Sequence, residues 1–151
     1  MKIFIRQMKL TDINQVMNLN ESSLSENYDR DFWLEMFGLG KTHSFVAIYQ
    51  TQIIGYIFCD NQYIISFAIN EKYRGLGIGK NLLSNCLNTF NIPIRLHVRI
   101  SNNIAIKLYN SYDFKIEDTM ENYYTNPDEN AYSMIWSPNK KYEYKRKLDV
   151  Q

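Results

Sequence analysis

The sequence predicts an α/β fold, in which helices cover a β-sheet within one domain of 151 residues. Apolar runs typical of strands alternate along the chain with segments whose apolar residues recur at helical spacing. A glycine-rich loop at residues 75–79 joins one of these runs to a helix. A chain of this length can bury a sizeable hydrophobic core.

The first half of the chain is expected to hold four strands and two helices. The expected strands span residues 3–8, 44–49, 53–59 and 63–69, and the middle two form a hairpin. A first helix is expected to begin at Thr11-Asp12, where Gln15 completes a capping pattern. A second helix is expected from Asp29 to Phe37, closed by Gly38.

The second half is expected to start with a helix over residues 77–90. Its apolar face is made of Ile78, Leu82, Leu83, Cys86, Leu87 and Phe90. A strand at 94–100, a helix at 102–111 and strands near 114–120 and 131–136 follow. Residues 137–151 are rich in Lys and Arg and are expected to form a basic, mobile tail; a contact with ribosomal RNA or a partner subunit is the alternative.

Composition restricts the class of protein. A hydrophobic content of 45% with 22% charged residues is typical of a soluble globular protein, and a net charge of +1 argues against DNA binding. No apolar run could span a membrane, and the N-terminus resembles a strand more than a signal peptide. Cys59 and Cys86 lack metal-ligand spacing, so we expect reduced core thiols, no metal site and a cytoplasmic location.

The run Tyr73-Arg74-Gly75-Leu76-Gly77-Ile78-Gly79-Lys80 carries the strongest functional signal. Glycines let backbone N–H groups approach a ligand, and the helix start behind them adds unpaired donors and a positive dipole end. The spacing fits neither a dinucleotide fingerprint nor a phosphate loop. It resembles the R-x-x-G-x-G/A motif of the GNAT superfamily of N-acetyltransferases, which holds the pyrophosphate of acetyl-CoA; a glycine turn that only caps the helix is the alternative.

This resemblance implies a GNAT fold over residues 1–136, with a mixed, mostly antiparallel central sheet of about seven strands and helices on both faces. It implies acetyl-CoA as co-substrate, with no metal. The residues that it implies for acetyl-CoA binding are Phe67, Ala68, Ile69, Arg74, Gly75, Leu76, Gly77, Ile78, Gly79, Lys80, Asn102, Ala105 and Tyr109. A backbone N–H near Phe67 to Ile69 is the expected donor to the oxyanion.

The segment Asn102 to Tyr109 resembles the family's second cofactor segment, N-x-x-A-x-x-x-Y. Small Ala105 lets the helix approach the pantetheine arm, and Tyr109 lies one turn further on the same face. In the family this tyrosine can donate a proton to the leaving thiolate; a buried aromatic with a satisfied hydroxyl is the alternative for Tyr109. Asp113 replaces the usual glycine after this helix, and we expect it to adopt the same left-handed turn.

Three further stretches resemble the catalytic subunits of protein N-terminal acetyltransferases of the A and E types. They are residues 24–28, 96–103 and 122–132. The match implies Tyr63 and His97 as a general base acting through ordered water, as in the E type. Flanking arginines are expected to lower the pKa of His97, although a strand histidine is often simply a satisfied polar neighbour.

The same match implies that Leu24, Glu26, Tyr28, Tyr123 and Tyr124 line the substrate channel, although the tyrosines could instead pack in the core. Glu26 resembles the A type and Tyr63 the E type, so the chain combines features of both. We expect a protein N-α-acetyltransferase that acts on N-termini of peptides or nascent proteins by direct attack in a ternary complex. The alternatives are a polyamine or antibiotic acetyltransferase and a non-catalytic acetyl-CoA-binding subunit that docks a partner.

Overall fold

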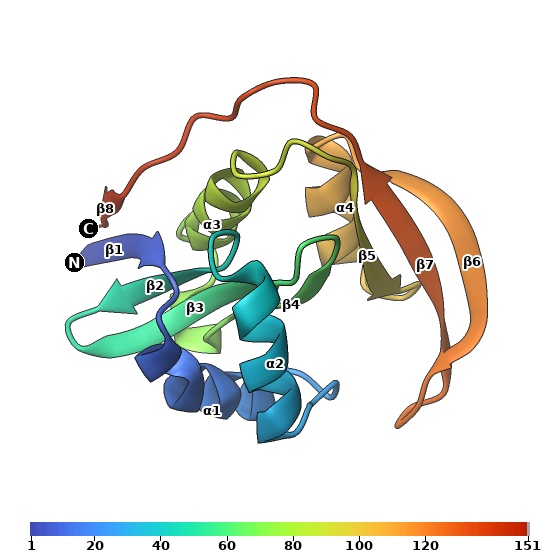
Figure 1. The fold of residues 1–151 in the computed structure, drawn as a ribbon, viewed down its shortest axis with the longest axis horizontal. Coiled ribbons are helices and arrows are strands. Elements are labelled where there is room, and N and C mark those ends of the chain that lie inside the picture. Colours follow the sequence, from blue (N-terminus) through green and yellow to red (C-terminus); the bar gives the residue numbers. More distant parts are fainter. Residues whose placement is uncertain (151) are drawn as a thin grey trace. The chain divides into compact units, whose positions relative to one another are not determined.

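The computed structural model describes residues 1–150, which divide into two compact units (Figure 1). The first unit contains residues 1–90 together with the C-terminal residues from Lys140 onward, and the second contains residues 91–139. We expected one domain over residues 1–136 followed by a tail. In the structure the residues after Lys140 return to the first unit.

The first unit is built on a five-stranded sheet in the order β4-β3-β2-β1-β8, in which every pair of neighbours is antiparallel. Its strands are β1 (Lys2–Gln7), β2 (Phe45–Tyr49), β3 (Gln52–Cys59), β4 (Ile64–Ile69) and β8 (Lys147–Asp149). Its helices are α1 (Ile13–Ser23), α2 (Arg30–Gly40) and α3 (Ile78–Leu87), with short 3-10 turns η1 (Leu10–Asp12) and η2 (Glu71–Tyr73). Helices α1 and α2 lie on one face of the sheet and α3 on the other (Figure 1).

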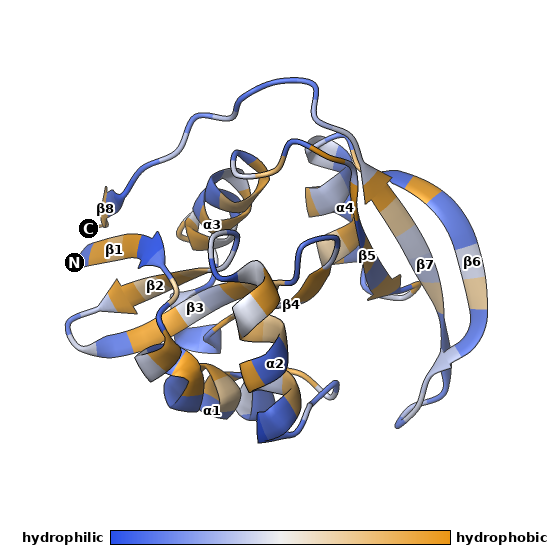
Figure 2. Ribbon diagram, in the orientation of Figure 1, coloured by the Kyte–Doolittle hydropathy of each residue, from blue (hydrophilic) through white to orange (hydrophobic). Residues whose placement is uncertain are grey.

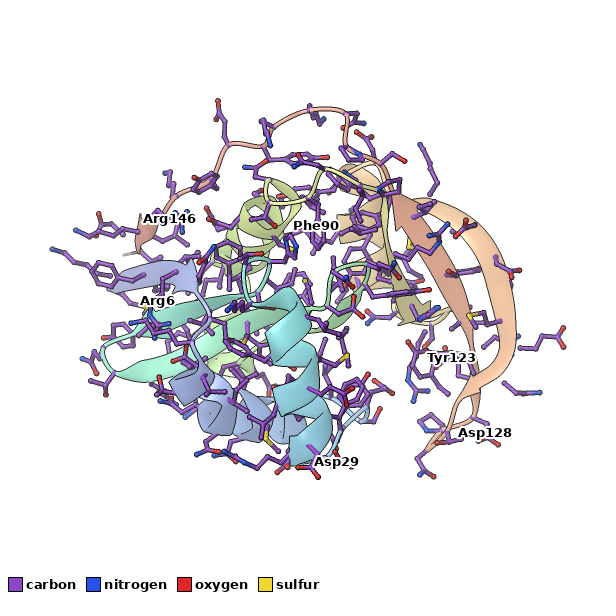
Figure 3. All side chains as sticks on the ribbon, in the orientation of Figure 1. Arg6, Asp29, Phe90, Tyr123, Asp128 and Arg146 are labelled. Carbon is purple, nitrogen blue, oxygen red and sulfur yellow. The ribbon has the colours of Figure 1, made fainter. Side chains whose placement is uncertain are left out.

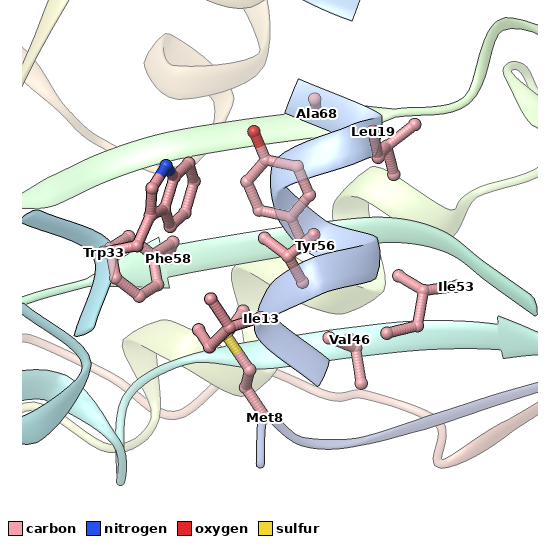
Figure 4. Packing of buried hydrophobic residues seen from close by; sticks show 10 residues of the cluster. Met8, Ile13, Leu19, Trp33, Val46, Ile53, Tyr56, Phe58 and Ala68 are labelled. Carbon is pink, nitrogen blue, oxygen red and sulfur yellow. The ribbon is translucent and has the colours of Figure 1, made fainter. Parts of the chain in front are cut away.

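The main core of this unit lies between the sheet and helices α1 and α2 (Figure 4). Its buried members are Met8, Ile13, Val16, Leu19, Trp33, Val46, Ile53, Tyr56, Phe58 and Ala68. On the opposite face, the six residues predicted for the apolar stripe of α3 are all buried, which confirms that prediction. Cys59 and Cys86 are free and buried, with their sulfur atoms 3.4 Å apart.

The second unit is a three-stranded antiparallel sheet in the order β5-β7-β6, with one helix. Its elements are β5 (Ile94–Arg99), α4 (Asn103–Ser111), β6 (Lys115–Tyr124) and β7 (Glu129–Trp136). The core side chains Leu96, Phe114, Met134 and Trp136 are buried. Asp113 has φ 68°, so it adopts the left-handed turn that we predicted after α4.

The α/β class with helices on both faces is confirmed, but the sheet differs in detail from the prediction. Within residues 1–150 the strands form sheets of five and three members, instead of one sheet of about seven. Helix α2 also continues through Gly38 to Gly40. A Cβ at Gly40 would lie 1.7 Å from the carbonyl oxygen of Cys59, so a tertiary contact, more than a local stop signal, explains the glycine there.

The C-terminal segment follows α3 and then pairs with β1, whereas we expected a mobile tail over residues 137–151. Asn88, the C-cap of α3, exchanges two hydrogen bonds with the backbone of Tyr142, of 2.7 and 2.8 Å, and Asn81 on α3 accepts from the N–H of Lys145 at 2.7 Å. The N–H of Ile5 then donates to the carbonyl of Arg146 at 2.8 Å. The segment is largely hydrophilic (Figure 2), so backbone hydrogen bonds hold it more than apolar burial does.

None of the helices in the part of the chain that the structure describes is long and apolar enough to cross a membrane.

Candidate active site

The glycine loop precedes α3, and two of its glycines adopt left-handed backbone conformations. Gly75 and Gly77 have φ values of 79° and 85°, in the left-handed region that other residues enter only with strain. A Cβ added at either glycine would meet nothing within 4 Å. Gly77 is the N-cap of α3 and supplies no side chain, so the first-turn N–H groups stay available to an outside acceptor. This cradle has the space and the donors that a diphosphate requires.

Strand β4 leads into this loop along the edge of its sheet. The N–H of Asn70 donates to the carbonyl of Ile54 on β3, at 2.7 Å. By the alternation of an antiparallel ladder, the N–H groups of Phe67 and Ile69 point the other way, toward the outer edge. Arg74 folds back and its Nε donates to the carbonyl of Ile69 at 3.1 Å, which ties the loop to the end of the strand.

The predicted substrate loop between α1 and α2 rests on a buried polar cluster. The amide nitrogen of Asn20 lies 3.1 Å from the carbonyl of Glu26, 3.1 Å from the hydroxyl of Tyr56 and 3.3 Å from Ser66 Oγ. Asn27 donates back to Asn20 Oδ1 at 2.9 Å. Asn20 is only 1% exposed, so this amide fixes the loop from inside the molecule. The sequence pattern did not predict this role of Asn20.

Other predicted residues of the first unit have mixed surroundings. The ring of Tyr28 stacks on Phe32 with centroids 4.5 Å apart and meets the edge of Trp33, so Tyr28 packs against α2. Leu24 is half-buried against the main core. Tyr63 is half-buried just before β4, where its N–H donates to Asp60 Oδ1 at 2.6 Å.

His97 lies on the side of β5 that is opposite the core, as the alternation predicted. Its Nδ1 is 3.3 Å from the hydroxyl of Tyr123, and the two rings are 4.8 Å apart. Burial lowers the pKa of His97 below 6.5, which favours the neutral imidazole. We expected the flanking arginines to lower it. Instead Arg95 and Arg99 are each paired with a glutamate, and burial is the cause.

Tyr123 and Tyr124 form the wall of the β6–β7 hairpin next to His97. Their rings meet edge to face with centroids 5.0 Å apart, and Tyr123 is 44% exposed. Tyr123 and Asp128 both lie toward the end of this hairpin (Figure 3). The structure therefore brings together three predicted residues, His97, Tyr123 and Tyr124, within the second unit.

Helix α4 begins as its sequence predicts. The side chain of Asn102 caps it by accepting from the N–H of Ala105 at 3.2 Å. Tyr109 is 8% exposed and its ring lies 5.5 Å from that of Phe114. Tyr109 is thus a buried aromatic residue packed beside Phe114, and its catalytic role stays a prediction. So does the joint role of Tyr63 and His97, which belong to different units.

Comparison with known proteins identifies relatives of this chain. A model of the acetyltransferase (GNAT) family matches residues 13–114. An N-alpha-acetyltransferase of Sulfurisphaera tokodaii is 32% identical, over 86% of this chain and 90% of that protein. N-alpha-acetyltransferase 50 of Danio rerio is also 32% identical, over 75% of this chain and 74% of that protein.

Solved structures of similar proteins share the fold. Arabidopsis thaliana Naa50, in complex with a bisubstrate analogue, has a TM-score of 0.81 at 27% identity, covering 89% of this chain and 98% of that one. Ard1 from Thermoplasma volcanium has a TM-score of 0.80 at 28% identity, covering 89% and 96% of the two chains.

Proposed function

We propose that this protein, which belongs to the acetyltransferase (GNAT) family, transfers the acetyl group of acetyl-CoA to the free N-terminal amine of polypeptides. The observation that carries the proposal is the cradle at Gly75 and Gly77, which is open and lined by backbone N–H groups at the start of α3. The relatives named N-alpha-acetyltransferase support the peptide amine as acceptor.

Acetyl-CoA fits the residues that are present. Arg74, the glycine loop and the first turn of α3 would hold its pyrophosphate, while Asn102 and Ala105 at the start of α4 would meet the pantetheine arm. When bound, acetyl-CoA supplies an activated thioester. The outward N–H groups of β4 would stabilise the oxyanion, since donors held in place before reaction need no reorganisation.

His97 is the proposed base. An N-terminal amine has a pKa of about 8, so much of it is protonated near neutral pH and must lose a proton before it attacks. The lowered pKa of His97 keeps its imidazole neutral and able to accept that proton, directly or through water. When Nδ1–H donates to the hydroxyl of Tyr123, Nε2 is the accepting nitrogen. Tyr63 would order the water and Tyr109 would protonate the thiolate.

The residues proposed to bind the acceptor are Glu26 and Tyr28 of the α1–α2 loop and Tyr123 and Tyr124 of the β6–β7 hairpin. Glu26 would attract the amine and the tyrosine rings would wall the channel. Ribosome or auxiliary-subunit contacts and a cytoplasmic location are further proposals; the basic residues of the C-terminal segment support the first.

The test is incubation with acetyl-CoA and peptides that begin Met-Leu, Ser-Ala or Asp-Asp. Acetylation of an N-terminal amine supports the proposal, whereas acetylation of a polyamine alone would replace it with the small-molecule alternative. Acetyl-CoA binding without turnover of any amine would indicate a non-catalytic subunit. His97→Ala should lower kcat by ~10²-fold. His43→Gln is the matched control, because the ring of His43 stacks on that of Phe90 and His43 is not among the predicted site residues, so kcat should be unchanged.

A further inference from the structure

Arg99, the last residue of β5, holds the turn between β6 and β7. Its guanidinium donates to the carbonyl of Pro127 at 2.8 Å and to the carbonyl of Thr125 at 3.1 Å. The same group lies over the ring of Tyr124, 4.5 Å from its centroid. The Arg99 side chain is only 13% exposed, so these contacts are partly shielded from solvent. One side chain thus fixes both the turn and a wall of the predicted peptide channel.

Glu129, at the start of β7, extends this arrangement to the cofactor helix. Its Oε1 accepts from Arg99 at 3.2 Å, and its Oε2 accepts from the N–H of Ser101 at 2.8 Å. Ser101 immediately precedes Asn102, the N-cap of α4. Hydrogen bonds from the side chain of Ser101 first, and then from its N–H and from Arg99, lower the pKa of Glu129, so the carboxylate stays charged at neutral pH.

The turn needs such a partner because its own backbone is irregular. Asn122 and Asn126 both have φ 53°, a left-handed conformation that is uncommon outside glycine. The β6–β7 register also shifts between Met120 and Tyr124, so the ladder that leads to the Tyr124–Glu129 pair beside the turn is irregular. A planar guanidinium can serve two carbonyls, a carboxylate and an aromatic face at once, whereas an ammonium cannot.

We propose that Arg99 and Glu129 are positioning residues that link the start of α4 to Tyr124, so that acetyl-CoA and peptide bind to one connected arrangement. This inference rests on the proposed function, which makes α4 an acetyl-CoA-binding element and the hairpin a peptide-binding one. Neither residue touches the reacting atoms in this role. Disruption of the pair should therefore raise KM values and leave kcat nearly unchanged.

The second unit offers a matched control on the same strand. Arg95 pairs with Glu117 at 2.7 and 3.0 Å, but both side chains are about 40% exposed. Like Arg99 and Glu129, this pair is an arginine bonded to a glutamate, but these two hydrogen bonds join β5 to β6 and involve neither the turn nor the start of α4. Exposed ion pairs contribute little, so its conservative variants should behave as the unmodified protein.

The experiment compares Arg99→Lys and Glu129→Gln with Arg95→Lys and Glu117→Gln. We expect the first two to raise KM for both peptide and acetyl-CoA about tenfold, as for loss of a charged hydrogen bond, with kcat changed less than threefold. The control variants should stay within twofold of the unmodified protein. Unchanged KM values in Arg99→Lys and Glu129→Gln, or a fall in kcat alone, would overturn the proposal, because a purely structural defect reduces the active fraction and leaves KM intact.

A second readout separates this inference from the proposed function. Amide hydrogen exchange in Glu129→Gln should increase at residues 101–105 and 122–128 together, whether or not any peptide is acetylated. An increase in exchange at only one of these two segments would overturn the proposal that Arg99 and Glu129 link them. If the unmodified protein does not acetylate peptides while Glu129→Gln increases exchange at both segments, the result would instead count against the peptide as substrate. Glu129→Gln preserves shape, so it also serves if Arg99→Lys does not fold.

Discussion

Replacing Asn20 by Ala should destabilise the first unit and loosen the predicted substrate loop. The side chain is 1% exposed, and its two amide hydrogens are shared among Glu26, Tyr56 and Ser66. Tyr56 and Ser66 keep their mutual contact of 2.7 Å after the change. The carbonyl of Glu26 loses its donor, whereas the amide of Asn27 keeps the carbonyl of Leu24 at 3.0 Å, so we expect a loss of about 1–3 kcal/mol.

The assay is chemical denaturation of Asn20→Ala beside Asn18→Ala. Asn18 lies on the same helix but is exposed, so its variant should stay within about 0.5 kcal/mol of the unmodified protein. For a chain of this size, about 1–3 kcal/mol corresponds to a fall in Tm of roughly 2–12 °C. If Asn20→Ala and Asn18→Ala unfold within about 0.5 kcal/mol of each other, the amide does not hold the loop as argued.

Three further predictions concern the glycine loop, the histidines and the C-terminal segment. Gly77→Ala should cost about 1–2 kcal/mol and weaken acetyl-CoA binding by calorimetry, because φ is 85° there, whereas helical Gly38→Ala should be neutral or stabilising. Burial holds the pKa of His43 and His97 below 6.5, so both imidazoles should titrate below that value by NMR. The fold should also lose stability as pH falls through 6.5, because the unfolded chain then binds more protons; greater stability at lower pH would contradict this. Asn88→Ala removes both hydrogen bonds to Tyr142 and should speed tryptic cleavage after Lys141 and Lys145, while equal cleavage rates would show that Asn88 does not hold the segment.

Local patterns predicted the parts of the fold that depend on neighbours in sequence. The apolar stripe of α3 follows from helical periodicity, and the left-handed turn at Asp113 follows from what an aspartate tolerates. The glycine loop could be predicted because its positive φ values at Gly75 and Gly77 favour glycine, which is visible in the sequence. In each case a few adjacent residues contain the whole physical cause.

Contacts between distant residues explain what the sequence did not predict. Asn20 meets Tyr56 and Ser66 across 36 and 46 residues, and a single amide in a helical pattern carries no sign of such partners. Helix α2 passes through Gly38 because its end is set where Gly40 meets the backbone of Cys59. The sequence of the C-terminal segment resembles a solvated run of charged residues. Its side chains give no sign of docking, because its hydrogen bonds join its backbone to Asn81 on α3 and to Asn88 at the C-cap of α3.

The two units fix the segments that we predict to bind the substrate in the same way. Neither the α1–α2 loop nor the β6–β7 turn is held by a regular ladder, and each depends on one shielded polar side chain, Asn20 or Arg99. The glycine loop, by contrast, needs only its own backbone and the start of α3. Pyrophosphate binding at the glycine loop should therefore tolerate changes elsewhere in the first unit. Peptide preference should depend on Asn20 and Arg99 as much as on Glu26 and Tyr63, which differ between the A and E types. Exchanging Glu26 alone for an apolar residue should then alter the preferred first residue without reproducing either type.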